Sequence, residues 1–220
     1  MKYLNGYLSI IFLCLFSYDI YAQNKIIFEL STGLPYNFPL PLTIRQNGES
    51  TIHLTAQYDS RPFEVPIFWD WRIGYWNDST GWELEAIHHK IFLRNKPTEV
   101  EQFDVSHGIN LVVINRCYIK DDFIFKVGAG ISLTHPESVV RGKKLNEQRG
   151  IFDQGYYVSG PVMVFSAGKR LYLIEKVFLT VEAKIGLSYA YIPIADGAAD
   201  VYNIAAMLTF GIGTDFLKLN

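Results

Sequence analysis

The feature that most constrains the fold is the alternation of side chains along residues 201–216. The larger apolar side chains fall on one face of a strand here: Tyr202, Ile204, Ala206, Leu208, Phe210 and Ile212. The opposite face carries Asn203, Ala205, Met207, Thr209, Gly211 and Gly213. Strands of globular proteins usually run about 5 to 6 residues, whereas a tilted membrane-crossing strand needs about 9 to 11. The segment therefore predicts a membrane-crossing strand that is apolar outside and small or polar inside.

Residues 1–22 predict a secretion signal. Lys2 precedes the apolar run 7–16, which is too short to span a bilayer, and a polar stretch follows that ends at Ala22. Cleavage there removes Cys14 and leaves Cys117 alone, so no internal disulfide is expected. A retained anchor is the alternative, although no stop-transfer charges follow. We expect one mature domain over residues 23–220.

Further alternating segments predict the rest of a β-sheet. They cover residues 25–33, 42–46, 50–58, 66–76, 81–93, 102–118, 123–135, 152–173 and 176–192. After the signal, no apolar run is long enough for a membrane helix. Asn47-Gly48 is a strong hairpin signal between two of these segments. The count is about ten strands, or about eight if the proline-rich first hairpin does not cross the membrane.

Short and long connections alternate along the chain. Counting back from a periplasmic C terminus, the turns at 47–48, 77–80, 121–122 and 174–176 fall in the periplasm, and the connections at 35–41, 59–65, 94–101, 136–150 and 193–200 fall outside. Bacterial barrels show this parity. The predicted fold is all-β, a closed antiparallel transmembrane β-barrel. A secreted soluble β-sandwich is the alternative.

In this pattern the chain resembles the small outer-membrane β-barrel proteins of Gram-negative bacteria. The resemblance covers the mature chain and implies a place in the bacterial outer membrane, contact with its lipid and lipopolysaccharide, and insertion by the barrel-assembly machinery. Such barrels usually end on an aromatic residue, whereas this chain continues for four residues past Phe216. Phe216 is the candidate for a displaced terminal signal.

Charged residues on the inward faces predict a polar lumen. The predicted inward residues are Asp70, Arg72, Glu83, Glu85, Arg116, Lys126, Glu182 and Lys184, together with Glu29 and Asn110. A bore of eight to ten strands is narrow enough for side chains to fill. A buried charge without a partner costs several kcal/mol, so acids and bases are expected to pair and plug the bore.

Histidines mark the candidate chemistry. His107 as base, Ser106 or Ser132 as nucleophile and Glu137 as orienting acid form one candidate catalytic set. Ser106 and His107 are neighbours on a strand, so their side chains point to opposite faces unless a bulge intervenes. A metal bound by His88, His89 or His135 is a second candidate; no other cofactor is expected.

Three functional classes remain open. The first is a structural or partner-binding barrel that acts through its outer loops, in which Arg141, Lys143 and Lys144 could contact lipopolysaccharide phosphates. The second is a lipid hydrolase, since the chain is similar in size and barrel type to outer-membrane lipid A deacylases, although it lacks their histidine two residues before a serine. The third is a narrow pore. A net charge of -2 gives no case for nucleic-acid binding.

Overall fold

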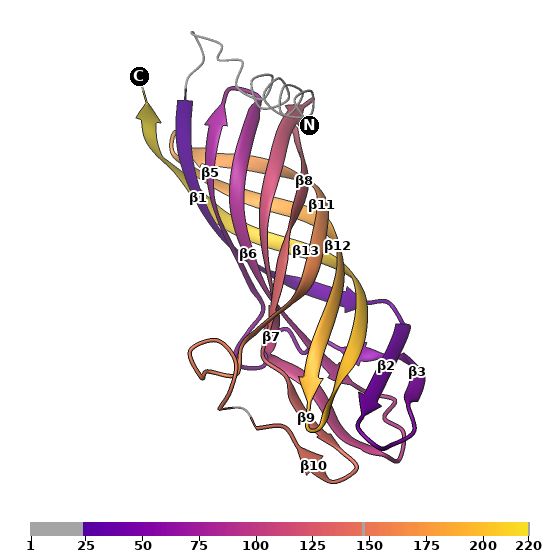
Figure 1. The fold of residues 1–220 in the computed structure, drawn as a ribbon. Coiled ribbons are helices and arrows are strands. Elements are labelled where there is room, and N and C mark those ends of the chain that lie inside the picture. The colour runs from indigo at the N-terminus through magenta and orange to yellow at the C-terminus, as the bar shows by residue number, and fades with distance from the viewer. Residues whose placement is uncertain (1–23, 147, 220) are drawn as a thin grey trace, which may run out of the picture.

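In the computed structural model, which describes residues 24–146 and 148–219, eight antiparallel strands close into a ring (Figure 1). Their order around the ring follows the chain, and β13 pairs with β1 to close it. The ring consists of β1 (Asn24–Asn37), β5 (Trp69–Asn77), β6 (Thr80–Leu93), β7 (Val100–Lys120), β8 (Phe123–Thr134), β11 (Tyr157–Ile174), β12 (Val177–Ile194) and β13 (Gly197–Leu219). The predicted closed antiparallel barrel is confirmed. Residues 1–22, predicted to be a signal, lie outside the described part.

The ring has eight strands, the alternative count, and the count of ten was wrong. β2 (Leu40–Gln46) pairs only with the end of β13 and with β3 (Ile52–Ala56), so this hairpin stands beyond the ring. The Asn47-Gly48 turn was predicted to be periplasmic, but Asn47 N–H donates to the carbonyl of Asp196, at the opposite end of the barrel. The proline-rich stretch redirects the chain before it can cross, because proline lacks the N–H that a sheet ladder needs.

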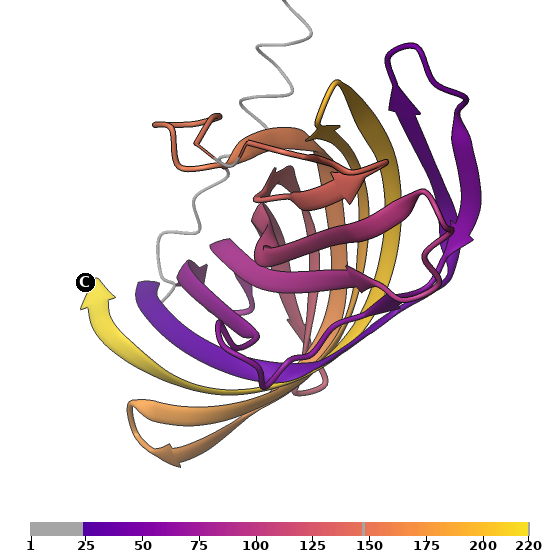
Figure 2. The same ribbon diagram turned by 90° about the horizontal axis from the view of Figure 1, so that it is seen from below.

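The two ends of the barrel differ in their connections. At one end, here the turn end, the connections are tight at residues 78–79, 121–122 and 175–176, and both ends of the described chain lie there (Figure 1). At the other, the loop end, β2, β3, β9 (Glu137–Val140) and β10 (Lys143–Lys144) extend the sheet. The predicted long connection at 193–200 is instead a two-residue turn between β12 and β13, which run far beyond the barrel proper. Figure 2 shows these elements from the loop end.

The outer surface of the ring is apolar. Each strand points one large hydrophobic side chain or more away from the bore, among them Leu30, Ile73, Leu84, Ile114, Val127, Phe165, Ile185 and Phe210. All of these are more than a third exposed, as expected for a surface that faces lipid rather than water. Trp69 and Trp71 lie on this face, where tryptophan suits a membrane interface.

Three packed layers fill the inside. A small apolar cluster of Ile27, Trp76, Cys117, Ile124 and Phe178 closes the turn end. A layer of charged side chains follows. Above it, a large apolar core runs from the barrel into the extension at the loop end, where Phe68, Ile91, Phe103, Val140 and Ile192 are all buried. The described residues contain no helix long and apolar enough to cross a membrane.

Candidate functional site

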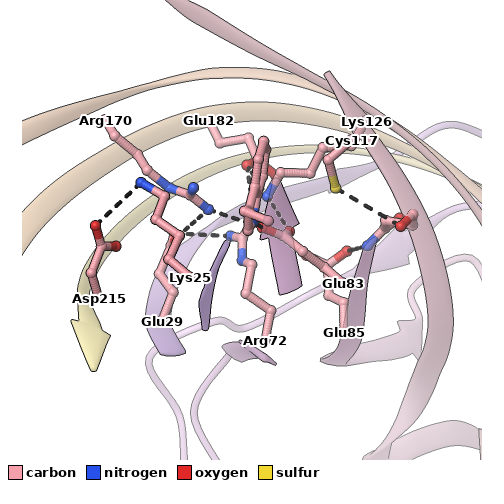
Figure 3. A network of polar contacts seen from close by, with 12 residues as sticks. Lys25, Glu29, Arg72, Glu83, Glu85, Cys117, Lys126, Arg170, Glu182 and Asp215 are labelled. Carbon is pink, nitrogen blue, oxygen red and sulfur yellow. Dashed lines mark hydrogen bonds and ion pairs between the residues drawn. The ribbon is translucent and has the colours of Figure 1, made fainter. Parts of the chain in front are cut away.

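Arg72 lies at the centre of the charged layer. Its guanidinium, fully buried on β5, is 2.7 Å from Glu182, 3.2 Å from both Glu29 and Asp70, and 3.7 Å from Glu85 (Figure 3). These carboxylates come from β1, β5, β6 and β12, so one side chain ties strands on different sides of the bore together. A planar guanidinium with five donors suits this position better than any other cation.

Three more cations surround this centre. The Lys184 ammonium is 2.6 Å from Asp70 and 2.9 Å from Glu182, and it also pairs with Glu85. Lys126 reaches Glu83 at 2.8 Å and Glu182 at 3.0 Å. Arg170 reaches Glu83 at 2.9 Å and Glu29 at 3.3 Å.

The charged groups of this ionic layer pair with one another. Its five carboxylates and four cations are each 5% exposed or less, and each contacts at least one opposite charge. Asn115 and Trp76 donate further hydrogen bonds, to Glu85 at 2.7 Å and to Glu83 at 3.0 Å. Buried charges survive in a protein only when they are paired and hydrogen-bonded in this way. Because its side chains are buried and paired with one another, the layer fills the bore as a plug.

The structure places seven of the eight predicted lumen residues in this layer; Arg116 is the exception. Arg116 points outward over the rings of Trp82 and Tyr118, at 5.2 Å from each, and donates to the Gly81 carbonyl. Asn110 likewise lies outside, against His88. The error arises because β7 is apolar on both faces around Val112 and Val113, so alternation does not fix its parity.

Arg170 and Asn115 are interior residues that the sequence did not identify. Asn115 shares the inward parity of β7 with Val113 and Cys117. Arg170 lies on β11, opposite Thr180 of β12, whose inward parity through Glu182 and Lys184 was already predicted. Pairing β11 to β12 from the tight turn between them would have placed Arg170 inside.

A second polar cluster lies at the loop end, where β7 bulges. The pairing of β6 with β7 shifts register between His89 and Ile91, and Gly108 has a φ of +100°. This bulge brings Ser106 and His107, chain neighbours, to the same carboxylate: His107 Nδ1 is 3.0 Å from Glu137 Oε1, and the Ser106 hydroxyl donates to that oxygen. Three of the four predicted catalytic residues are therefore together.

The arrangement departs from a Ser-His-acid triad. Ser106 Oγ lies 3.2 Å from Nδ1 of His107, the same nitrogen that Glu137 contacts. In a working triad the acid and the hydroxyl bind opposite ring nitrogens, so that the imidazole takes the hydroxyl proton at one nitrogen while the acid orients the ring through the other. Here the carboxylate holds both groups directly.

Around this cluster lie further polar and aromatic groups. Gln102 donates to Asp104 at 3.0 Å and to Glu137 at 3.4 Å. Burial raises the pKa of Asp104, more than the hydrogen bond from Gln102 lowers it. The ring of His135 lies 4.7 Å from that of His107 and 4.9 Å from that of Tyr156.

The remaining candidates are dispersed. Ser132 is buried on the inward face of β8 and donates to the Gly160 carbonyl, away from His107. His88 stacks outside on Trp69, with ring centroids 5.2 Å apart, while His89 lies inside at 2.8 Å from Asn37. Over residues 24–146 and 148–219, no group of three or more His, Cys, Asp or Glu is placed to hold a metal.

The basic residues of the long connection lie at the tip of the extension. Arg141 donates to Gln46 and to the Ser50 carbonyl, and Lys143 pairs with Asp196 at 2.9 Å. The hydrogen bond to Asp196, together with the charge of that carboxylate, raises the pKa of Lys143. These contacts fasten β9 and β10 to the β2–β3 hairpin and to the β12–β13 turn.

Comparison with solved structures returns small outer-membrane barrels. The attachment invasion locus protein Ail of Yersinia pestis aligns with 89% of this chain and 99% of its own at 10% identity and a TM-score of 0.42. OprG of Pseudomonas aeruginosa aligns with 87% of this chain and 96% of its own, at 13% identity and a TM-score of 0.42. The outer-membrane protease OmpT of Escherichia coli aligns with 89% of this chain and 94% of its own, at 9% identity and a TM-score of 0.34. No family model and no curated protein matches the chain. At these identities and TM-scores the neighbours indicate no function for it.

Proposed function

We propose that the protein is an integral component of a bacterial outer membrane, a closed barrel that carries a rigid β-sheet extension for contact with partners outside the cell. The observation that carries this proposal is the filled interior. The ionic layer blocks the bore, and the apolar core above it continues without a break into the extension. Such a barrel supports an external structure and leaves no path for solutes.

The orientation follows from the two ends. Short turns lie in the periplasm and extended connections outside in barrels of this kind, so the loop end faces outward. We place the barrel-assembly machinery among the partners, with Phe216 as the displaced aromatic signal; the side chain of Phe216 lies outside the described part. Outer-membrane lipid surrounds the barrel, and lipopolysaccharide phosphates would meet the exposed cations of the extension, among them Lys144.

Conductance distinguishes the supporting barrel from a pore. The purified protein, folded into a planar bilayer, should give no channel steps, while its migration on a gel should change when the sample is boiled. Steady unitary conductance from the heat-modifiable form would refute the plug.

A second candidate function is hydrolysis of a lipid ester at the loop end. It rests on the bulge at Gly108, which brings Ser106 and His107 to Glu137 on the exposed surface. Incubation with lipopolysaccharide or phospholipid vesicles should then release fatty acid, and His107→Ala should abolish the release. His53→Ala is the matched control, because His53 is an exposed histidine that contacts Thr43 on the β2–β3 hairpin. No release with any divalent metal would refute the hydrolase.

A further inference from the structure

One segment on the outside of the barrel exposes several large apolar side chains, although it lies near polar loops. Residues 61–67, here the side loop, form most of the connection between β4 (Tyr58–Asp59) and β5. Phe63 is 69% exposed, Val65 90% and Ile67 48%. Large exposed apolar patches on a folded protein mark contact with a partner or with lipid.

The side loop is attached to the membrane-facing wall. The Phe68 carbonyl, which follows the loop directly, accepts a hydrogen bond of 3.0 Å from Thr32. Thr32 lies on β1 between Leu30 and Leu34, two outward leucines that are each 49% exposed. Farther along, Pro62 and Tyr36 line one surface pocket, and Tyr36 and Phe38 are exposed beside it. The apolar surface of the loop is therefore continuous with the lipid-facing belt.

The loop also covers a cation on that wall. Lys90 points outward from β6, two residues beyond His88 and its stacking partner Trp69, yet Lys90 is only 3% exposed. Its ammonium donates to the Glu64 carbonyl at 2.8 Å. The guanidinium of Arg61 lies 4.2 Å from the Phe92 ring on the same face. Cations and aromatic rings at one level, next to an apolar belt, are the pattern of a membrane interface.

The backbone of the loop turns back on itself at two points. Pro62 and Pro66 have no N–H, the amide of Glu64 donates to the Arg61 carbonyl, and the amide of Phe68, just after the loop, donates to the Pro62 carbonyl.

We propose that the side loop is a lipid-inserting wedge, with Phe63, Val65 and Ile67 among the acyl chains of the leaflet at the loop end. The occupant is the lipid, because the patch continues the belt and lies at the level of Trp69 and Lys90. The inference goes beyond the filled barrel but requires that the barrel spans a membrane.

Spin labels on single cysteines test the proposal in the full mature chain, reconstituted in lipid vesicles on a Cys117→Ala background. Labels go on Val65→Cys, on Phe63→Cys as a second position in the loop, on Met163→Cys in the belt and on Glu49→Cys at the tip of the extension. Collision with oxygen and with a water-soluble nickel chelate is measured at each site. All four side chains are exposed, so folding should persist, and heat-modifiable migration checks it.

The wedge predicts chelate collision at positions 65 and 63 severalfold lower than at 49, with high oxygen collision, as at 163. If the label at position 65 collides often with the chelate while the label at position 163 does not, the wedge is overturned and the membrane barrel still stands. Low collision with both reagents at 65 would also overturn it, since a protein would then cover the patch. A chelate-accessible position 163 would instead refute the proposed membrane location.

Discussion

Removing the charge of Arg72 tests whether the ionic layer acts as one unit. In Arg72→Met the layer keeps five carboxylates but only three cations. None of the four carboxylates that Arg72 contacts is left alone: Glu29 keeps Arg170, Asp70 and Glu85 keep Lys184, and Glu182 keeps Lys126 and Lys184.

The expected loss follows from that arrangement. If each contact counted separately, four broken pairs would unfold the barrel outright. Because every acid retains a cation, the variant carries one further uncompensated charge, and a buried pair broken on one side costs about 3–5 kcal/mol. We expect the free energy of unfolding to fall by about that amount.

The compensated variant sharpens the test. Arg72→Met with Glu182→Gln removes one charge of each sign and leaves Lys126 with Glu83 and Lys184 with Asp70. It should recover a large part of the loss. Arg45→Met is the matched control for the arginine itself: Arg45 pairs with Asp200 but is half exposed, so its loss should cost less than about 1 kcal/mol.

Urea unfolding of the vesicle-bound protein, followed by tryptophan fluorescence, gives these free energies. A loss in Arg72→Met no larger than in Arg45→Met would refute the reasoning. A double variant as unstable as Arg72→Met alone would also refute it, because the stability of the layer would then not depend on its net charge.

Three further outcomes are expected. Gly108→Ala should destabilise the protein by about 1–3 kcal/mol, because the residue has positive φ and its new Cβ would lie 2.5 Å from His88 Nδ1; unchanged urea unfolding would contradict the bulge. Asp104→Asn should be more stable than the native chain at pH 7 and should lose that advantage near pH 3. The pKa of Asp104 is higher in the folded chain than the unfolded value of about 3.9, so the stability of the native chain falls as the pH rises above that value. Unfolding measurements in which the native chain gained stability relative to Asp104→Asn with rising pH would exclude this. Cys117, fully buried, should resist thiol reagents in the folded barrel and react in urea, as mass spectrometry would record; rapid labelling of the folded form would show that the turn end is open.

The site was only partly readable from the sequence. Alternation on β5, β6, β8 and β12 placed Asp70, Glu83, Lys126 and Lys184 inward, because each of these strands has one clearly apolar face. β7 has two apolar faces, and Arg116 was accordingly assigned to the wrong side. The sequence named Ser106, His107 and Glu137 but could not bring them together, since strict alternation separates the first two until Gly108 allows a bulge.

The sequence by itself determined that this chain closes into a barrel. Long strands that alternate apolar with small or polar residues, as 201–216 do, must pair every backbone group while turning one face to lipid, and a closed antiparallel ring satisfies both demands. Only the tertiary structure decided that eight strands enter the ring and that β2 and β3 extend it. Those features depend on register and on which strand lies beside which across long stretches of chain. Alternation within a single segment does not fix either of them.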